Sequence, residues 1–276
     1  MPVKSSKRVT RLLTNREMRE ITMQQSALDC GCEPGDFLRE ENVVCPLRLG
    51  PDAKRYYEEP LTCTMVSYGN NIVAAVKDEY RAVVEEYISR FTWYHCFETP
   101  NLYWLKERLS PLGQKVCFMA EYFLPDVDRL RPLSCAYELK TLTQEDFASL
   151  YVPEWGNALC EKRKQLDVLG VGAYDNGALI GLAGCSADAA DMLQIGVDVL
   201  PAYRRKGIAK ALTSHLALEI LRRDKVPFYC CAWSNVRSAR NAIACGFSPA
   251  WVEMSVKPAA IVDEMNGEPV HQSRSR

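Results

Sequence analysis

The stretch LPAYRRKGIAKALTSHLALEI, residues 200–220, decides the fold of the C-terminal part of this chain. From Ala209 onward its apolar side chains recur at three- and four-residue spacing, which predicts an amphipathic helix. The start of this helix is unfavourable, because Arg204, Arg205 and Lys206 lie where the helix macrodipole is already positive. Gly207 lowers the helix stability further. A strongly anionic ligand bound at this point would explain the arrangement.

The composition is that of an ordinary globular protein. The chain has 276 residues, of which 47% are hydrophobic and 25% charged, with a net charge of −1, and this length predicts about two domains. No apolar run approaches the roughly 18 residues that a membrane span requires, and no apolar segment follows the basic start, residues 1–13. We expect a cytoplasmic protein, monomeric or homodimeric, without a nucleic-acid or membrane partner.

The chain contains 12 cysteines. Scattered thiols in a chain without a secretory signal favour packing in a reducing compartment. Cys30, Cys32, Cys45 and Cys63 are the closest group in sequence, but their spacing lacks the two close pairs of common zinc sites. We therefore predict that no metal is bound.

Apolar periodicity and turn residues predict the order of the secondary-structure elements. In the N-terminal half we expect a helix after residue 15, two strands within 61–76, helices over 79–91 and from Thr99 as N-cap, and a buried strand over 114–124. After a proline-containing link we expect a strand over 134–142, a capping box at Thr143 and Asp146, a hairpin over 166–187 turning at 175–177, strands over 192–200, 227–233 and 247–256, and helices over 206–222 and 235–245.

This order predicts an α/β (α+β) fold with a mixed central sheet flanked by helices and parallel pairing at its centre. The link near residue 130 predicts three segments: an N-terminal α/β domain over 1–130, a second domain over 134–257, and a flexible tail over 258–276. The N-terminal domain has no anion-binding signature, and a degenerate relative of the second domain is one interpretation of it.

Three features of the second domain occur in a characteristic order. The strand over 192–200 leads into Arg204-Arg205-Lys206-Gly207-Ile208-Ala209, Asn235 follows a later strand and is succeeded by Ser238, and the next helix ends in Cys245-Gly246-Phe247. Together they resemble the GNAT family of N-acetyltransferases, whose signature is Arg/Gln-x-x-Gly-x-Gly/Ala. The resemblance covers less than half of the chain.

The resemblance implies that the helix start holds the diphosphate of coenzyme A. The first four N–H groups of a helix lack intrahelical partners and donate hydrogen bonds to such an anion, and Gly207 lets the phosphates approach the backbone. The pantetheine arm would pair with the strand at about 195–199, as an added strand does. The residues so implied are Ile195, Gly196, Val197, Val199, Arg204, Arg205, Lys206, Gly207, Ile208, Ala209, Lys210, Asn235 and Ser238.

The implied reaction transfers an acetyl group from acetyl-CoA, as co-substrate, directly to a primary amine within a ternary complex. A backbone N–H of the strand would polarise the thioester carbonyl. Many family members use a tyrosine to protonate the departing thiolate, but Ala242 stands at that position here. Ser238 is our first candidate for this acid, and Tyr229 and Tyr203 are weaker ones.

Three carboxylates are candidates for the base that deprotonates the amine, namely Glu154, Asp191 and Asp198. The acceptor stays open among small amines, antibiotics, peptide N-termini and lysine. Because Ala242 replaces the tyrosine, a non-catalytic acyl-CoA-binding or regulatory module is the alternative hypothesis. A structural or interaction protein without a coenzyme A site is the third.

Overall fold

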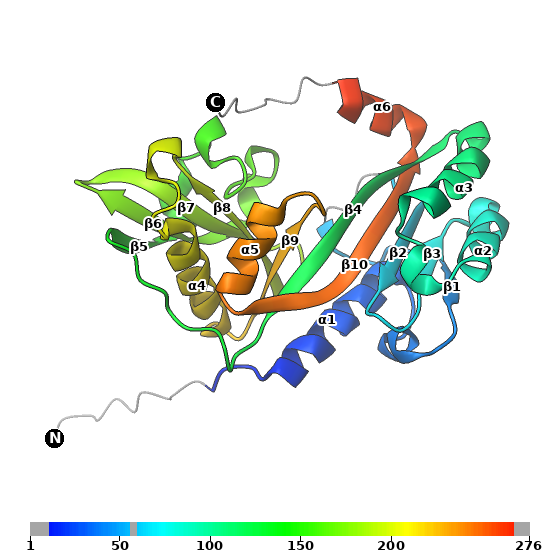
Figure 1. The fold of residues 1–276 in the computed structure, drawn as a ribbon, viewed down its shortest axis with the longest axis horizontal. Coiled ribbons are helices and arrows are strands. Elements are labelled where there is room, and N and C mark those ends of the chain that lie inside the picture. Colours follow the sequence, from blue (N-terminus) through cyan, green and yellow to red (C-terminus); the bar gives the residue numbers. More distant parts are fainter. Residues whose placement is uncertain (1–10, 56–59, 268–276) are drawn as a thin grey trace. The chain divides into compact units, whose positions relative to one another are not determined.

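The computed structural model describes residues 11–55 and 60–267 of the chain (Figure 1). Most of the basic N-terminal stretch and residues 268–276 of the predicted tail lie outside the described residues. The chain forms two compact units that interleave along the sequence. Within its described residues, the first unit holds Met1–Thr22, Phe123–Cys230 and Val236–Ser248, and the second holds Met23–Tyr122, Cys231–Asn235 and Pro249–Arg276.

The domain limits expected above, 1–130, 134–257 and 258–276, stay a prediction. Compactness divides the chain differently, because the strands β4 (Gln114–Pro125) and β10 (Phe247–Pro258) each contribute residues to both units. The proline-containing link after β4 is therefore not the only place where the chain passes between units.

The first unit is built on a mixed sheet, as predicted. Its strand order is β9-β8-β7-β6-β5, with bounds Val226–Cys231, Met192–Val199, Ala178–Ser186, Asp167–Asp175 and Glu138–Thr143. Strands β5 to β8 pair antiparallel, whereas β8 and β9 pair in parallel. The expected parallel pairing is thus confirmed.

The β6–β7 hairpin turns where the sequence predicts. Asn176 and Gly177 have φ values of +48° and +83°, the left-handed conformation that a two-residue hairpin turn requires. A Cβ is absent at Gly177 and asparagine tolerates this region, so the turn forms without strain. A capping box commonly opens an α-helix, but the segment after β5 differs. Only the short 3-10 turn Gln144–Phe147 forms there, although the predicted capping box between Thr143 and Asp146 is present.

Two helices, α4 (Ile208–Leu221) and α5 (Val236–Ala244), cover one face of this sheet (Figure 1). Helix α4 lies so close to β7 that a Cβ on Gly181 would be 2.9 Å from the Ile208 Cγ2 atom. Helix α5 is held to α4 by two hydrogen bonds. Asn241 Nδ2 donates to Thr213 Oγ1 at 3.0 Å, and the Cys245 thiol donates to the Lys210 carbonyl at 3.4 Å.

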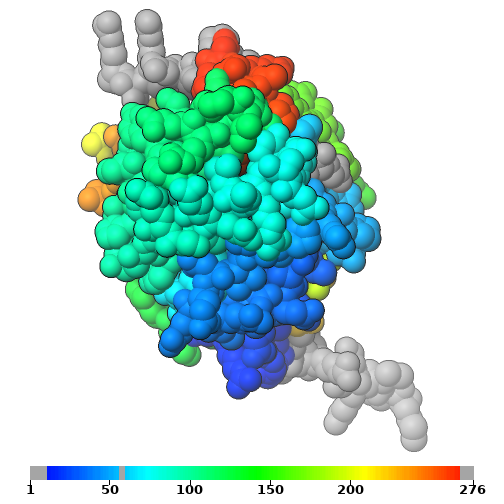
Figure 2. Space-filling model, turned by 90° about the vertical axis from the view of Figure 1, so that its right-hand side faces the viewer, coloured from blue at the N-terminus to red at the C-terminus, as the bar shows by residue number. Residues whose placement is uncertain are grey.

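The second unit has its own sheet and core. The strands β1 (Val43–Pro46), β3 (Val73–Val76), β2 (Cys63–Ser67), β10 and β4 follow one another in that order. Helices α2 (Arg81–Arg90) and α3 (Thr99–Leu109) bury Tyr87 and Leu105 with the side chains of β2 and β3 in one apolar cluster. Figure 2 looks onto α2 and α3, which form the outer surface of this unit. Helix α1 (Asn15–Cys30) has residues in both units.

Three local predictions in the second unit need correction. Glu98, not Thr99, is the N-cap of α3, and the strand over 114–124 is only partly buried. The segment expected to be a loose tail begins with helix α6 (Ala259–Gly267). The Ala259 N–H donates to the Gly113 carbonyl at 2.8 Å and Lys115 pairs with Asp263, so tertiary partners order a segment of polar composition.

A buried ionic network lies in the second unit. The Lys54 side chain is fully buried, and its Nζ is 2.8 Å from Glu253 Oε1 and 3.1 Å from Asp29 Oδ2. Glu253 Oε1 also accepts a hydrogen bond from the Trp251 indole at 2.7 Å, and the Trp251 ring stacks on Tyr122 at 4.7 Å between ring centroids. Burial raises the pKa of Asp29, while the Lys54 charge opposes that rise. No sequence pattern indicated this network.

Candidate functional site

The loop between β8 and α4 has an unusual backbone conformation. After the short turn Pro201–Tyr203, Arg205 has a φ of +63° and Gly207 a φ of +80°. A positive φ is strained for arginine, and strain of this kind is concentrated at functional sites. Left-handed residues in a turn also bring successive backbone N–H groups together into an anion-binding concavity. The loop backbone therefore has the form of an anion site.

The amide groups that open α4 have no cap from the residue before them. Gly207 is the N-cap and makes no side-chain capping bond, and the first turn holds no acidic residue. The first intrahelical bond runs from the Ala211 N–H to the Gly207 carbonyl at 3.1 Å. The amides before Ala211 are those that a helix leaves for an external acceptor. This geometry is the one that an anion site at the helix start requires.

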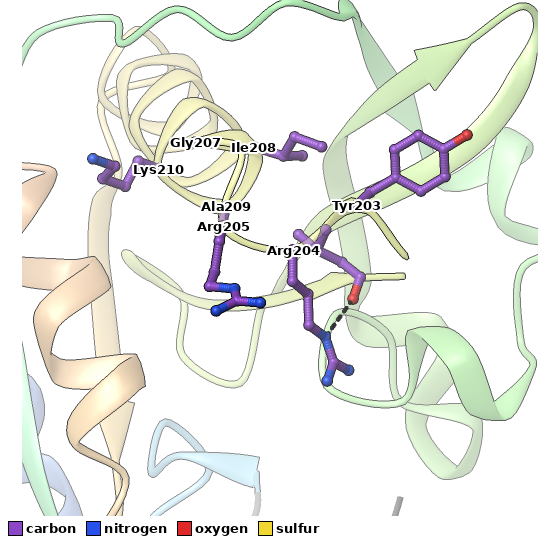
Figure 3. A pocket seen from close by; sticks show the side chains of 8 residues that line it. Tyr203, Arg204, Arg205, Gly207, Ile208, Ala209 and Lys210 are labelled. Carbon is purple, nitrogen blue, oxygen red and sulfur yellow. Dashed lines mark hydrogen bonds between the residues drawn. The ribbon is translucent and has the colours of Figure 1, made fainter. Parts of the chain in front are cut away.

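A cavity of about 190 Å³ lies beside these amides. It is lined by the end of β8 and the start of α4, namely Val199, Tyr203, Arg204, Arg205, Gly207, Ile208, Ala209 and Lys210. In the view of Figure 3 the guanidinium groups of Arg204 and Arg205 extend to the same side of the loop, whereas the Tyr203 ring points away from them. The Arg204 Nε donates to the Val199 carbonyl at 3.1 Å, which fixes the base of its side chain.

The third cation of the loop, Lys206, is not among the residues that line the cavity. Its Nζ lies 4.8 Å from the centroid of the Tyr203 ring and 3.3 Å from the Tyr137 hydroxyl. The Tyr203 hydroxyl donates to Asp175 Oδ2 at 2.9 Å, and this bond is the main cause that raises the pKa of Tyr203. The sequence grouped three cations around the anion, but the structure brings Arg204, Arg205 and Lys210 to the cavity and packs Lys206 on two tyrosine rings.

Strand β8 opens along one edge as it approaches this cavity. Its described pairs with β9 end where Ile195 faces Tyr229, but its pairing with β7 continues to Val199. Burial changes at the same place, because Ile195 is buried and residues 196–199 are half-buried. The two parallel strands therefore fork at Ile195 and Tyr229. The backbone of residues 196–199, which the sequence singled out, lines the open side of this fork.

Asn157 and Ala158 pack closely against one face of β8. A Cβ on Gly196 would lie 1.8 Å from the Asn157 carbonyl oxygen, and a Cβ on its cross-strand partner Gly184 would lie 2.2 Å from the Ala158 carbonyl oxygen. Asp198 Oδ2 accepts hydrogen bonds from the Asn157 and Ala158 N–H groups at 2.8 and 3.0 Å. Asp198, a candidate base in the sequence, thus anchors this segment.

We expect Gly196→Ala to destabilise the first unit by about 1–3 kcal/mol, because the new methyl group would overlap a backbone oxygen that cannot rotate away. Urea unfolding measures this change in the free energy of unfolding. Gly35→Ala is the matched control, since a Cβ there meets nothing within 4 Å. Equal stability of the two variants would contradict the close approach of Asn157 to the strand.

Two candidate acids from the sequence are hydrogen-bonded to each other. The Tyr229 hydroxyl lies 2.8 Å from Ser238 Oγ, so a side chain of β9 and one of α5 meet. Tyr229 is 3% exposed, whereas Ser238 is half-buried. Ala242, one helical turn after Ser238, is fully buried and has no group that transfers a proton. Asn235, which belongs to the second unit, directly precedes α5 in the sequence, and its N–H donates to the Ala232 carbonyl at 2.9 Å.

Glu154 and Asp191 are the two remaining candidates for the base. Glu154 is exposed in the turn Pro153–Trp155, which leads into the segment anchored by Asp198. Asp191 precedes β8 at the end opposite to the cavity and pairs with Lys225 at 2.8 Å. A strand rises about 3.3 Å per residue, so the length of β8 separates Asp191 from Val199 by more than 20 Å. Measured in the same way, Asp191 lies about 13 Å from Ile195, so its role as a base stays a prediction.

No group of three or more potential metal ligands occurs among residues 11–55 and 60–267. The thiols Cys30, Cys32 and Cys45 are close enough for hydrogen bonds between them, and this bonding and burial raise the pKa of Cys32 and of Cys45. Cys231 is buried, and burial raises the pKa of its thiol as well. Thiols of raised pKa are poor nucleophiles and poor ligands at neutral pH. In the same part of the chain, no helix is both long and apolar enough to cross a membrane.

Sequence reasoning missed part of the cavity wall. Tyr203 lines the cavity, and Tyr137 and Asp175 hold Tyr203 and Lys206 in place. The position of Tyr203, directly before Arg204, was the one local signal. Tyr137 and Asp175 are distant in sequence, so no spacing rule indicated them.

The mixed sheet and the helix start beside the cavity agree with the family resemblance of the sequence. Comparison with protein families agrees, since the family described as GNAT acetyltransferase matches residues 118–250. Residues 118–250 are thus similar to GNAT acetyltransferases. The family match spans slightly less than half of the chain.

The solved structures to which this chain is similar share little sequence with it. A GNAT-family protein from Novosphingobium aromaticivorans is 18% identical, with 52% of this chain and 66% of that chain covered and a TM-score of 0.42. A GCN5-related N-acetyltransferase-like protein from Streptococcus suis is 20% identical, with 55% and 67% covered and a TM-score of 0.43. A GNAT-family acetyltransferase from Colwellia psychrerythraea is 15% identical, with 73% and 83% covered and a TM-score of 0.42. No curated protein matches the chain.

Proposed function

We propose that this protein transfers an acetyl group from acetyl-CoA to a primary amine by direct attack in a ternary complex. The single observation that carries the proposal is the uncapped start of α4, where Arg205 and Gly207 adopt positive φ values beside a cavity lined with cations. This set of groups fits a diphosphate, since N–H groups and guanidinium groups both donate to phosphate oxygens.

The residues proposed to hold acetyl-CoA follow from the cavity and the fork. Arg204, Arg205 and Lys210 supply positive charge, and the amides of residues 207–210 supply donors. The open edge of β8 at residues 196–199 offers backbone groups to the two amides of the pantetheine arm, in the manner of an added strand. When bound, acetyl-CoA supplies an activated acyl group. The chain binds it, orients it and polarises its carbonyl through a strand N–H.

The amine acceptor must lose a proton before it attacks, because an amine with a pKa of about 10.4 is almost fully protonated at neutral pH. Glu154 is the carboxylate that we propose for this step. It lies on the exposed turn before the segment that Asp198 anchors to β8. Asp198 itself is committed to two backbone N–H groups, and Asp191 lies at the other end of the strand.

The experiment is incubation of the protein with acetyl-CoA and a panel of small amines, amino-sugar antibiotics, peptides and lysine, while the release of free thiol is followed. Thiol release that depends on an amine supports the proposal. Thermal unfolding with and without coenzyme A is measured in parallel, and binding at 100 times the dissociation constant would stabilise the protein by about 2.7 kcal/mol.

One observation favours a second candidate function. Ala242 is buried at the position where the family resemblance implies a tyrosine acid, and a non-catalytic acyl-CoA-binding or regulatory module needs no acid. Stabilisation by coenzyme A without turnover of any acceptor would support this module. Unchanged melting in saturating acetyl-CoA would exclude both candidates.

A further inference from the structure

We infer that Ser238 and Tyr229 form a two-hydroxyl relay that protonates the departing thiolate in place of a residue at position 242. The inference rests on the proposed function. We assign to Ser238 the role of catalytic residue, which gives its proton to the leaving group, and to Tyr229 the role of positioning residue, which donates to Ser238.

The pair of hydroxyls lies at the fork between β8 and β9. The cavity lies at Val199, and an extended arm along β8 runs from there toward Ile195, where pairing with Tyr229 begins. Four strand residues span about 13 Å, which is similar to the length of a chain of two amide units that ends in a thiol. The thiol end therefore reaches the fork, and Tyr229 is the residue of β9 at that point.

The contacts between α5 and α4 indicate how far Ser238 lies from the cavity. Helix α5 is pinned to α4 at two levels, since Cys245 contacts Lys210 and Asn241 contacts Thr213. The two helices therefore run antiparallel at these contacts. Residues earlier in α5 lie beside residues later in α4, which are farther from the cavity. Ser238 precedes Asn241 by three residues, or most of a turn. Ser238 therefore lies farther from the cavity than Thr213 does, in the direction in which the arm runs along β8.

Ser238 is more exposed to solvent than Tyr229. Tyr229 is 3% exposed and packs edge-on against Phe247 at 6.3 Å between ring centroids. Ser238 is half-buried in the first turns of α5. Their oxygens are 2.8 Å apart. Because Ser238 is the more exposed of the two, the serine is the member that a ligand reaches, and the tyrosine behind it supplies the proton. A phenol of pKa about 10 is the more acidic of the two hydroxyls.

When the thiolate departs, the carbon–sulfur bond of the tetrahedral intermediate breaks, and the sulfur leaves with the electron pair. Ser238 Oγ gives its proton to the sulfur and takes the proton of the Tyr229 hydroxyl. Once coenzyme A has left, Tyr229 regains a proton from solvent by way of the half-buried Ser238, and solvent also receives the proton that the attacking amine has lost. No oxidant, reductant or metal takes part.

The test uses the full chain and three substitutions. Ser238→Ala removes the reachable hydroxyl, Tyr229→Phe removes the one behind it while keeping the ring, and Ser238→Thr keeps a hydroxyl. The matched control is Tyr68→Phe, because the Tyr68 hydroxyl also lies 2.8 Å from a serine oxygen, Ser26 Oγ, within the second unit. The control and Tyr229→Phe thus break the same kind of bond.

Two quantities are measured. The first is the pKa of the thiol of bound coenzyme A, followed by thiolate absorbance in the binary complex, which needs no turnover. A donor to the thiolate lowers that pKa, so Ser238→Ala should raise it by about one unit. The second is turnover against pH, which should fall about 10²-fold in Ser238→Ala and in Tyr229→Phe. The double variant should lose no more than the worse single variant, since the two hydroxyls act in series.

Ser238→Thr should restore the thiol pKa and most of the turnover, and Tyr68→Phe should change neither. A thiol pKa unmoved in Ser238→Ala, in a protein that binds coenzyme A and turns over, would overturn the relay and leave the proposed function intact. A wild-type protein that fails to bind coenzyme A would overturn both. Equal losses of turnover in Tyr229→Phe and Tyr68→Phe would show that the hydroxyl pair contributes to stability alone, and would overturn the relay.

Discussion

Gly207→Glu is expected to weaken coenzyme A binding by about 100-fold or more, equal to about 2.8 kcal/mol at 1.4 kcal/mol per tenfold. The new carboxylate would stand at the helix start, where the proposed diphosphate accepts from the amides. A Cβ at Gly207 meets nothing within 4 Å, so the substitution fills space rather than displacing the core. Titration calorimetry with coenzyme A measures the dissociation constant.

The control for this prediction is Gly207→Ala. Both variants impose a side chain on a residue with a φ of +80°, which strains the backbone by roughly 1–2 kcal/mol. Only the glutamate adds a negative charge and bulk. We therefore expect the alanine variant to bind coenzyme A far more tightly than the glutamate variant, at similar stability. Equal affinities would show that no anion binds beside residue 207.

Lys54→Met is expected to lower the free energy of unfolding by about 3–5 kcal/mol at pH 7, because it leaves buried carboxylates without their cation. Lys54 is completely buried between Asp29 and Glu253, and both carboxylates are almost fully buried as well. This loss is a large part of the 5–15 kcal/mol that typically stabilises a domain. Urea unfolding followed by tryptophan fluorescence measures it, since Trp251 donates to Glu253.

The same variant should lose less stability as the pH falls from 7 toward 5. Burial raises the pKa of Asp29 above its usual value, and the Lys54 charge works against that rise. Without Lys54 the pKa of Asp29 in the folded protein rises further. A raised carboxyl pKa adds stability below the unfolded-state pKa and loses it as the pH climbs through the folded-state value. Acid therefore neutralises the unpaired carboxyl and recovers part of the loss.

Lys225→Met is the control for Lys54→Met. It removes a lysine from an ion pair whose side chains are 37% and 62% exposed, and an exposed pair contributes only about 0.2–1 kcal/mol. A loss in Lys54→Met as small as in this control, or one that grows in acid, would contradict the network as described.

The sequence predicted the parts of the fold that short-range rules govern. The turn at Asn176 and Gly177, the capping box at Thr143, and the start of α4 all depend on residues that are adjacent in the chain. The same is true of the mixed sheet, because alternating strands and helices imply parallel pairing. After β5 the chain forms only short 3-10 turns such as Gln144–Phe147, so the capping box at Thr143 does not open an α-helix there.

Residue pairs that are far apart in the chain were not accessible in this way. Lys206 has the same charge and neighbourhood in the sequence as Arg205, but Tyr137, 69 residues earlier, draws it out of the cavity. Asp198 was a candidate base, and only the packing of Asn157 on the sheet showed it to be an anchor. A single sequence records no contacts, so the roles of these side chains depend on partners that it does not indicate.

By itself the sequence determined the periodicities, turns and caps, and with them the helix start that gathers cations and bare amides, because each is a property of consecutive residues. The tertiary structure alone decided which of those cations line the cavity, where β8 and β9 fork, that Ser238 meets Tyr229, and that Lys54 is buried with Glu253. These features require segments far apart in the chain to be brought within a few ångströms, and only the folded packing of the core specifies such distances.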